Sequence, residues 1–187
     1  MGRLVVITGP SGVGKGTLIR HLLDRLPELE LAVSATTRKP RPGETHGRDY
    51  WFLADEEFDR RLALGDFLEH AEYSARRYGT LRAELASRVA GGRTVLLEIE
   101  VQGARQVREE LPDALLVFIA PPSSDALRAR LVGRGTDDPE QVERRLRVAE
   151  QELAAQNEFG EVVVNDRLED AVDELVDIVR RALPSGG

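Results

Sequence analysis

The 187-residue sequence contains no cysteine, which excludes disulfide bonds, thiolate metal sites and a cysteine nucleophile. Long apolar runs are also missing, since no stretch approaches the ~20 residues that a membrane-spanning helix needs. The short apolar stretch at residues 4–8 runs straight into glycines and lacks the cleavage site of a signal peptide. We therefore expect a cytoplasmic protein with no membrane partner.

Lysine is almost absent, because only Lys15 and Lys39 among the 26 basic residues are lysines and the other 24 are arginines. A compositional bias toward arginine explains most of this imbalance. Lysine and arginine nevertheless differ in chemistry, so a retained lysine is worth examining. Acidic residues outnumber basic ones 33 to 26, for a net charge of -7. This balance argues against a globally basic protein that binds nucleic acid.

The order of the predicted elements indicates one α/β domain. The short β-branched run at residues 4–8 is typical of a buried strand, and the apolar residues between 15 and 26 are spaced for one face of a helix. Further strands are predicted at 29–35, 94–100, 114–120 and 162–164, and further helices at 81–89, 104–110, 123–132, 139–156 and 168–183. This alternation predicts a parallel sheet with helices on both faces, in which ligands bind at the carboxyl ends of the strands.

Residues 34 to about 80 interrupt this alternation. The segment begins rich in arginine, proline and glycine, and continues with a predicted short helix at 55–64 and short strands at 67–73 and 77–80. Asp55 suits the helix N-cap and Gly65 suits its end. The segment therefore predicts a small mixed α+β insertion in the parallel domain.

A glycine-rich phosphate loop joins the first strand to the first helix, which favours a P-loop NTPase-type fold. Its pattern is glycine, four residues, then Gly-Lys, in the strand–turn–helix setting that such a loop requires. Backbone N–H groups wrap around phosphate oxygens at the helix N-terminus, and Lys15 places a compact charge on the β- and γ-phosphates. The predicted ATP-binding residues are Gly9, Pro10, Ser11, Gly12, Val13, Gly14, Lys15, Gly16 and Thr17.

The residue after Lys15 departs from the common pattern. A serine or threonine that ligates magnesium usually stands there, whereas this sequence has Gly16 followed by Thr17. Either Thr17 supplies an oxygen to Mg²⁺, or nucleotide phosphates and water hold the ion, because Mg²⁺ keeps several of its waters. We expect Mg²⁺, bound together with ATP, as the cofactor.

Motifs along nearly the whole chain resemble guanylate kinase, the family that phosphorylates GMP. They occupy residues 34–44, 47–50, 67–73, 78–80, 98–104, 130–135 and 163–166 and occur in the family's order. The resemblance implies magnesium-dependent transfer of the γ-phosphoryl group of ATP to GMP, and to dGMP, giving ADP and GDP. It also implies a core at residues 1–33, 87–124 and 151–187, a GMP-binding domain at 34–86 and a helical lid region at 125–150.

The resemblance assigns the GMP phosphate to a set of donors within the predicted insertion. Arginine presents a planar donor fork to a phosphate dianion, and tyrosine hydroxyls add single donors, so the residue types suit this role. A solvated arginine patch is the alternative reading for the arginines, and core packing is the alternative for the tyrosines. The assigned residues are Ser34, Arg38, Arg41, Tyr50 and Tyr78.

Recognition of the base follows a different logic. One carboxylate can accept both the N1–H and the 2-amino group of guanine, and it would face the N1 lone pair of adenine unfavourably. The resemblance gives this role to Glu69, with Thr80 donating toward O6. A surface acid on a short strand is the alternative for Glu69.

Glu98 and Glu100 end the strand predicted at 94–100. A separation of two residues would place both side chains on one face of that strand. There they would meet the magnesium shell, ordered water or the GMP base, or they would pair with core arginines. We place Glu98 in the GMP-binding set.

Two arginines near the predicted lid resemble those that bridge the nucleotides in the family. They are Arg134 and Arg145, with Arg130 as an assistant, and Lys15, Arg134 and Arg145 form the predicted catalytic set. Phosphoryl transfer gains mainly from positioning and from cancelling charge on the moving group. The alternative is a charged helix face. Arg76 and Arg77 stand where the family has other residues, and their effect on the pocket is open.

Two other functions compete with an active kinase. Guanylate-kinase-like modules in scaffold proteins bind peptides and often lack a complete phosphate loop, but this chain keeps Gly14, Lys15 and the lid arginines, and we expect no attached partner domain. A kinase for another acceptor, such as a ribose phosphate, fits the predicted nucleotide-binding set less well. We expect ATP and GMP as partners, no nucleic acid, and a monomer or homodimer.

Overall fold

Five parallel strands form the central sheet in the computed structural model, which describes residues 3–73, 75–132 and 139–183. The strands are β1 (Leu4–Thr8), β2 (Leu29–Leu31), β7 (Thr94–Glu98), β8 (Leu115–Ala120) and β9 (Glu161–Val164). They lie in the order β2-β7-β1-β8-β9, and all neighbouring pairs are parallel. The predicted strand at 29–35 is therefore shorter than expected.

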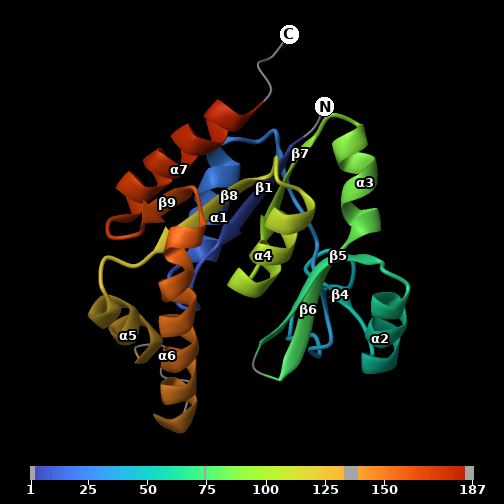
Figure 1. Cartoon of the computed structure of the whole chain (residues 1–187), viewed down its shortest axis with the longest axis horizontal. Coiled ribbons are helices and arrows are strands. Elements are labelled where there is room, and N and C mark those ends of the chain that lie inside the picture. The colour runs from blue at the N-terminus through green and yellow to red at the C-terminus, as the bar shows by residue number, and fades with distance from the viewer. Residues whose placement is uncertain (1–2, 74, 133–138, 184–187) are drawn as a thin grey trace.

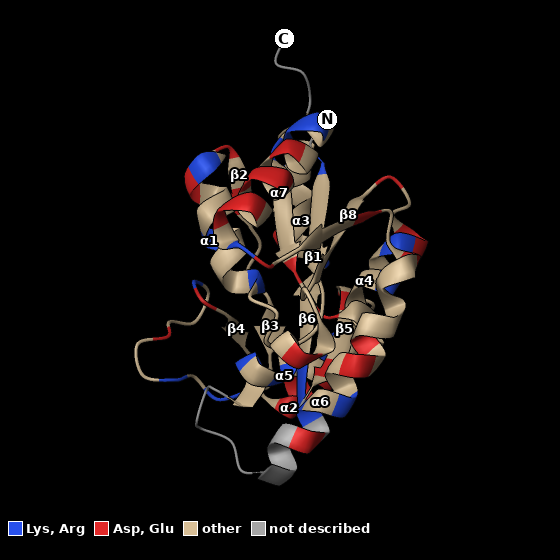
Figure 2. Cartoon of the chain, turned by 90° about the vertical axis from the view of Figure 1, so that its left-hand side faces the viewer, with Lys and Arg blue, Asp and Glu red and all other residues tan. Residues whose placement is uncertain are grey.

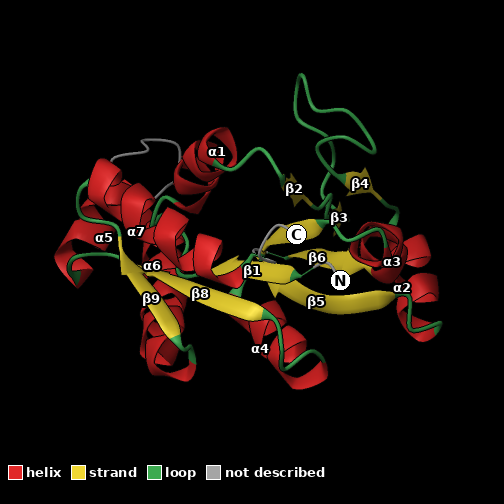
Figure 3. Cartoon of the chain, turned by 90° about the horizontal axis from the view of Figure 1, so that it is seen from above, coloured by secondary structure: helices red, strands yellow, loops and turns green. Residues whose placement is uncertain are grey.

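Helices cover both faces of this sheet, so that β1 is buried on both sides (Figures 1 and 3). Val5 and Ile7 pack against α1 (Lys15–Arg25), α5 (Ser124–Val132), α6 (Pro139–Ala154) and α7 (Leu168–Ala182). Leu4 and Val6 pack against α3 (Arg82–Ala90), α4 (Val101–Glu110) and the 3-10 turn at Ala155–Glu158. The alternation of side chains along the strand thus divides the core into two layers, which confirms the predicted α/β fold.

A second, four-stranded sheet lies within the connection between β2 and β7. It consists of β3 (Ala35–Thr36), β4 (Trp51–Phe52), β5 (Phe67–Tyr73) and β6 (Arg76–Leu81), in the order β4-β3-β6-β5, with α2 (Asp55–Ala63) beside it. Phe58 of α2 stacks on Phe67 of β5 with ring centroids 4.4 Å apart, in a small core of its own. The mixed α+β segment is thus observed, while its role and domain boundaries stay predictions.

The prediction of one strand over 94–100 is wrong at its end. The strand ends at Glu98, Ile99 is buried, and Glu100 is the N-cap of α4 with φ -75° and ψ 161°. The chain turns here because α4 begins at Val101, which is buried against the sheet. Glu98 and Glu100 consequently reach the cleft from a strand end and a helix start, and not from one face of a strand.

The surface mixes charges of both signs. Figure 2 shows basic and acidic residues interspersed on the helices around the sheet, as in the ion pair between Arg25 of α1 and Asp173 of α7 at 3.0 Å. No helix within the described ranges is long and apolar enough to cross a membrane.

Candidate nucleotide-binding site

The phosphate loop lies between β1 and α1, at the carboxyl end of the sheet. Gly9 has φ +141°, and a Cβ at this position would lie 2.3 Å from the carbonyl oxygen of Ile119 in β8. Gly14 has φ +101°, and a Cβ there would lie 2.7 Å from Nδ2 of Asn165. The loop therefore requires glycine at these positions, both for backbone conformation and for close packing against the sheet.

Two side chains hold the loop from behind. Asn165, which is 8% exposed, donates from Nδ2 to the carbonyl oxygen of Val13 at 2.8 Å. Arg130 donates to the same oxygen at 3.2 Å and to the carbonyl of Asn165 at 2.9 Å. Arg130, expected to assist the lid arginines, is therefore bound to the back of the loop.

Lys15 lies at the floor of the loop. Its ammonium donates to the carbonyl oxygens of Gly9 at 2.5 Å and Pro10 at 3.4 Å, and it lies 4.0 Å from Oε2 of Glu100. The residue is only 8% exposed. A fixed and partly desolvated cation is therefore present where the loop opens into the cleft.

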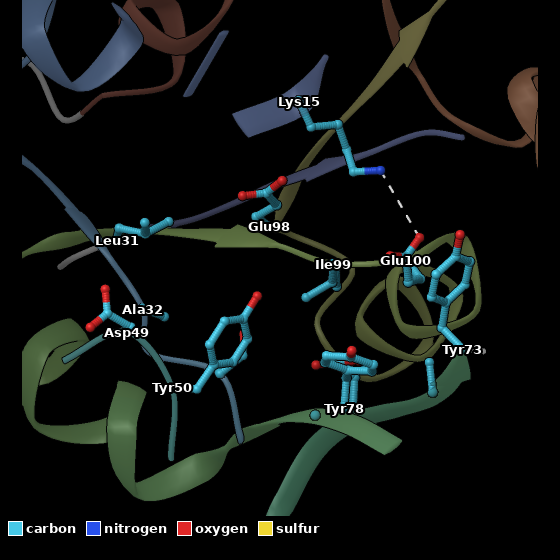
Figure 4. Close-up of a pocket in the computed structure, with 14 residues that line it drawn as sticks. Lys15, Leu31, Ala32, Asp49, Tyr50, Tyr73, Tyr78, Glu98, Ile99 and Glu100 are labelled. Carbon is cyan, nitrogen blue, oxygen red and sulfur yellow. Dashed lines mark ion pairs between the residues drawn. The ribbon is translucent and has the colours of Figure 1, made fainter. Parts of the chain in front are cut away.

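Two cavities meet at Lys15. The outer one, about 520 Å³, is lined by the phosphate loop with Thr17 and Arg20. The inner one, about 270 Å³, lies between the central sheet and the second sheet, and Figure 4 shows Lys15 entering it from the side opposite Tyr50 and Tyr78. Lys15, Glu98 and Glu100 line both cavities. A group bound in one cavity can therefore approach a group bound in the other at these three residues.

The inner cavity gathers most of the residues predicted to bind GMP. Ser34, Tyr50, Glu69, Tyr78 and Glu98 all line it. Thr80 reaches it indirectly, through its hydrogen bond to Glu69. The structure also adds side chains that sequence reasoning left out, namely Asp49 and Tyr73.

Glu69 is a buried carboxylate at the inner wall. It is 2% exposed, and its Oε1 accepts a hydrogen bond from the Thr80 hydroxyl at 2.7 Å across the β5–β6 pair. Burial raises the pKa of Glu69 to about 7, while the hydrogen bonds from Thr80 oppose the shift. A Cβ on Gly103 of α4 would lie 2.0 Å from its Oε2, so the glycine leaves the space that the carboxylate occupies.

Burial also raises the pKa of two further carboxylates near the cavities. Burial raises the pKa of Glu98, and the nearby Lys15 ammonium opposes the shift. Burial also raises the pKa of Glu152 in α6, and the charge of Glu100 adds to it. Glu152 went unnoticed in the sequence because it resembles any other acidic residue of an amphipathic helix.

The predicted phosphate-binding arginines are arranged around Glu44. Both guanidinium ends of Arg38 donate to the Glu44 carboxylate at 2.8 Å, and the backbone N–H of Arg41 donates to it at 2.6 Å. The Arg38 guanidinium also lies 5.2 Å from the centre of the Tyr50 ring. Hydrogen bonds from Arg38 and Arg41 lower the pKa of Glu44 to about 2. Arg38 is therefore ordered beside the cavity, whereas the Arg41 side chain is exposed and neither residue lines the inner cavity in the described part of the chain.

Ser11 joins three parts of the site. Its hydroxyl accepts hydrogen bonds from Tyr73 of β5 at 2.9 Å and from Arg145 of α6 at 3.3 Å. Its backbone N–H donates to Glu152 at 3.2 Å. The predicted Arg145 is thus placed at the phosphate loop, whereas Arg134 lies outside the described residues.

Arg77, whose effect on the pocket was open, turns away from it. Its guanidinium pairs with Asp55 at 2.9 Å and with Asp59, and it lies 4.7 Å from the centre of the Phe58 ring. These contacts fasten α2 to the second sheet.

Oxygen donors suited to a hard cation line the outer cavity, among them Thr17, Glu98 and Glu100. Within the described ranges, no group of three or more histidine and acidic side chains is arranged to hold a metal ion. The hydroxyl and the two carboxylates of the outer cavity are oxygen donors of the kind that Mg²⁺ takes.

Comparisons with known proteins identify the family of this chain. The family described as guanylate kinase matches residues 1–182. The chain is 55% identical to guanylate kinase of Streptomyces coelicolor over 174 residues, which cover 93% of this chain and 88% of that protein. It is 51% identical to guanylate kinase of Rubrobacter xylanophilus over 185 residues, covering 99% and 97%.

A solved structure gives the same answer for the fold. The crystal structure of guanylate kinase from Anaplasma phagocytophilum superposes with a TM-score of 0.80 at 33% identity, covering 98% of this chain and 87% of that one. A phosphate loop, a cavity with a buried carboxylate, and relatives matched over nearly their full length all lead to one conclusion: the chain belongs to the guanylate kinase family.

Proposed function

We propose that this chain transfers the γ-phosphoryl group of ATP to GMP, giving ADP and GDP, and that dGMP is a second acceptor. Membership of the guanylate kinase family supports the reaction. The observation that carries the assignment of sites is the shared wall of the two cavities at Lys15, Glu98 and Glu100. Together with the phosphate loop in the outer cavity and Glu69 in the inner one, it supports the outer cavity as the place for the ATP phosphates and the inner one as the place for GMP.

The phosphate loop binds ATP through its backbone N–H groups. Lys15 leaves the carbonyl oxygens of Gly9 and Pro10 and meets the β- and γ-phosphates, so that its charge follows the moving group. Mg²⁺, when bound with ATP, would neutralise phosphate charge, and Thr17, Glu98 and Glu100, which line the outer cavity, are the residues of this chain that would contact its shell.

Guanine binds at Glu69 and Thr80. When ionised, the Glu69 carboxylate accepts the N1–H and 2-amino groups, and the Thr80 hydroxyl turns toward O6. The buried position of Glu69 supports this role, because a desolvated acceptor is costly to leave unmatched and so discriminates strongly between bases.

The phosphate of GMP binds among Ser34, Tyr50 and Tyr78, with Arg38 and Arg41 closing over it. Arg38 is already ordered by its two hydrogen bonds to the Glu44 carboxylate. When GMP binds, its phosphate takes the place of this carboxylate and offers the guanidinium oxygen acceptors of similar geometry. This exchange keeps the guanidinium paired throughout and limits the cost of desolvating it.

Charge neutralisation and alignment perform the chemistry. A phosphate oxygen of GMP is already ionised and attacks the γ-phosphorus directly, so no general base is needed. Arg145, which lies at Ser11, and Arg134 supply positive charge as the phosphoryl group moves. In this proposal residues 34–86 form the GMP-binding domain, 125–150 the lid region, and the remainder the core of a cytoplasmic monomer or homodimer.

A coupled assay of ADP formation tests the function. The purified chain, with ATP and Mg²⁺, should phosphorylate GMP and dGMP and leave AMP almost untouched. Absence of turnover with millimolar GMP would refute the proposal, and equal turnover of GMP and AMP would refute the role of Glu69.

A further inference from the structure

One hydrogen bond joins the strand that carries Glu69 to the phosphate loop. The hydroxyl of Tyr73, at the end of β5, donates to Oγ of Ser11 at 2.9 Å, across 62 residues of sequence. The Tyr73 ring lines the inner cavity beside Glu100, as Figure 4 shows. We propose that Tyr73 is a positioning residue, whose bond to Ser11 sets the place of the acceptor nucleotide relative to the phosphate loop.

Strand β5 connects this hydrogen bond to the residue that holds the base. Glu69, Ala71 and Tyr73 are every second residue of the strand, so they lie on one face of it, and all three line the inner cavity. Four residues of strand place Glu69 and Tyr73 about 13 Å apart. The strand is paired along its length with β6, up to the match of Tyr73 with Arg76. Fixing the Tyr73 end therefore restrains the whole segment that holds the base.

The other end of the bond is also fixed. Ser11 donates its N–H to Glu152 of α6 and accepts a hydrogen bond from Arg145 of the same helix. A shift of Tyr73 relative to the loop would therefore disturb Ser11, which both Glu152 and Arg145 contact. The Ser11 hydroxyl thus links the second sheet, the phosphate loop and α6, which are the three parts that must be aligned for transfer.

The inference rests on the proposed function, because alignment matters only if two nucleotides react across the shared wall. In-line transfer depends steeply on distance, so a small loosening of β5 lowers the rate even when every binding group remains. Tyr73→Phe removes only the hydroxyl and keeps the ring. We expect it to lower kcat/KM for GMP about threefold to tenfold, the range for one lost hydrogen bond.

A double-mutant cycle separates this role from a general loss of packing. Tyr73→Phe, Ser11→Ala and the double variant are compared at 25 °C by kcat/KM for GMP, with folding checked by circular dichroism. Because each single change breaks the same bond, the double variant should be no slower than the slower single variant. The matched control is Tyr78→Phe, a tyrosine of the same cavity on β6, whose effect should multiply with that of Ser11→Ala.

A second readout does not depend on turnover. Hydrogen exchange of the β5 and β6 amides near Tyr73 should become faster in Ser11→Ala, although Ser11 lies in a distant segment, and should stay unchanged in Tyr78→Phe. This measurement decides the proposal even if Tyr73→Phe fails to fold. Multiplicative effects of Tyr73→Phe and Ser11→Ala, or unchanged exchange in Ser11→Ala, would overturn it. Absence of GMP turnover by the unaltered protein would instead overturn the proposed function.

Discussion

Replacing Glu69 by glutamine is expected to weaken GMP recognition and to stabilise the fold at the same time. Glutamine has the size of glutamate, so the packing against Gly103 is preserved. It replaces one acceptor oxygen with an amide donor, which then faces a donor of guanine. It also removes a buried group that is costly to ionise.

The stability change follows from the pKa of Glu69, which burial raises from 4.5 to about 7. Because the folded-state pKa lies above the unfolded value, the folded protein holds the proton more tightly, and stability falls as pH rises from about 4.5 to 7. At 1.36 kcal/mol per pKa unit, ionising Glu69 costs about 3 kcal/mol of unfolding free energy above pH 7. The unfolding free energy of Glu69→Gln should therefore equal that of the unaltered protein near pH 4 and exceed it at pH 8 by up to about 3 kcal/mol.

The kinetic change has the opposite sign. If Glu69 binds guanine as proposed, GMP requires the ionised carboxylate, and kcat/KM for GMP should fall about tenfold per pH unit below 7 in the unaltered protein. Glu69→Gln should lower kcat/KM for GMP about a hundredfold at pH 8, because one guanine donor and the new amide donor would face each other unsatisfied in a buried site, and it should leave KM for ATP within about twofold.

Urea unfolding at pH 4 to 8 and a coupled assay at pH 6 to 8 measure both effects. Thr80→Val serves as the control, because the Thr80 hydrogen bond lowers the pKa of Glu69 and its loss should move the fall in activity to higher pH. Titration of the GMP phosphate affects the unaltered protein and Thr80→Val equally, so a difference between their pH profiles reports on Glu69. Equal pH dependence of stability in the unaltered protein and Glu69→Gln would refute the argument from burial.

Three further predictions concern the loop and its surroundings. Lys15→Arg should abolish most activity despite keeping the charge, since the planar fork cannot replace the ammonium held at Gly9, and near-normal turnover would contradict this. Gly103→Ala should displace the Glu69 carboxylate and raise KM for GMP at least about tenfold with little change in KM for ATP, as steady-state kinetics with each substrate varied would show. Asn165→Ala should lower unfolding free energy by about 1–3 kcal/mol and raise KM for ATP more than KM for GMP; a larger effect on GMP would show that this side chain does not support the loop.

The parallel domain could be predicted because its signals are local. A β-branched run followed by glycines and a helical spacing of leucines identified β1, the phosphate loop and α1 with nearly correct bounds. The position of Glu69 came from the motif around it, and its burial matches the proposed role.

What the sequence did not reveal depends on contacts between distant segments. The pairing of Arg38 with Glu44 arises from a turn that brings an acid back to an arginine six residues earlier. The contact of Tyr73 with Ser11 crosses from one sheet to the other. Glu100 was misplaced because an apolar strand and the start of a helix share the same residue types, so only the buried turn at Ile99 distinguishes them.

The position of the second sheet in the chain has a consequence for how such a protein can diversify. β2 and β7 are hydrogen-bonded neighbours, and a parallel connection between neighbours needs little more than the crossover helix that α3 provides. Everything from β3 to β6 is inserted into that one crossover, so its two ends leave and rejoin the central sheet close together. The segment that we propose selects the acceptor can therefore change in length and sequence while the register of the central strands, and with it the position of the phosphate loop, stays as it is.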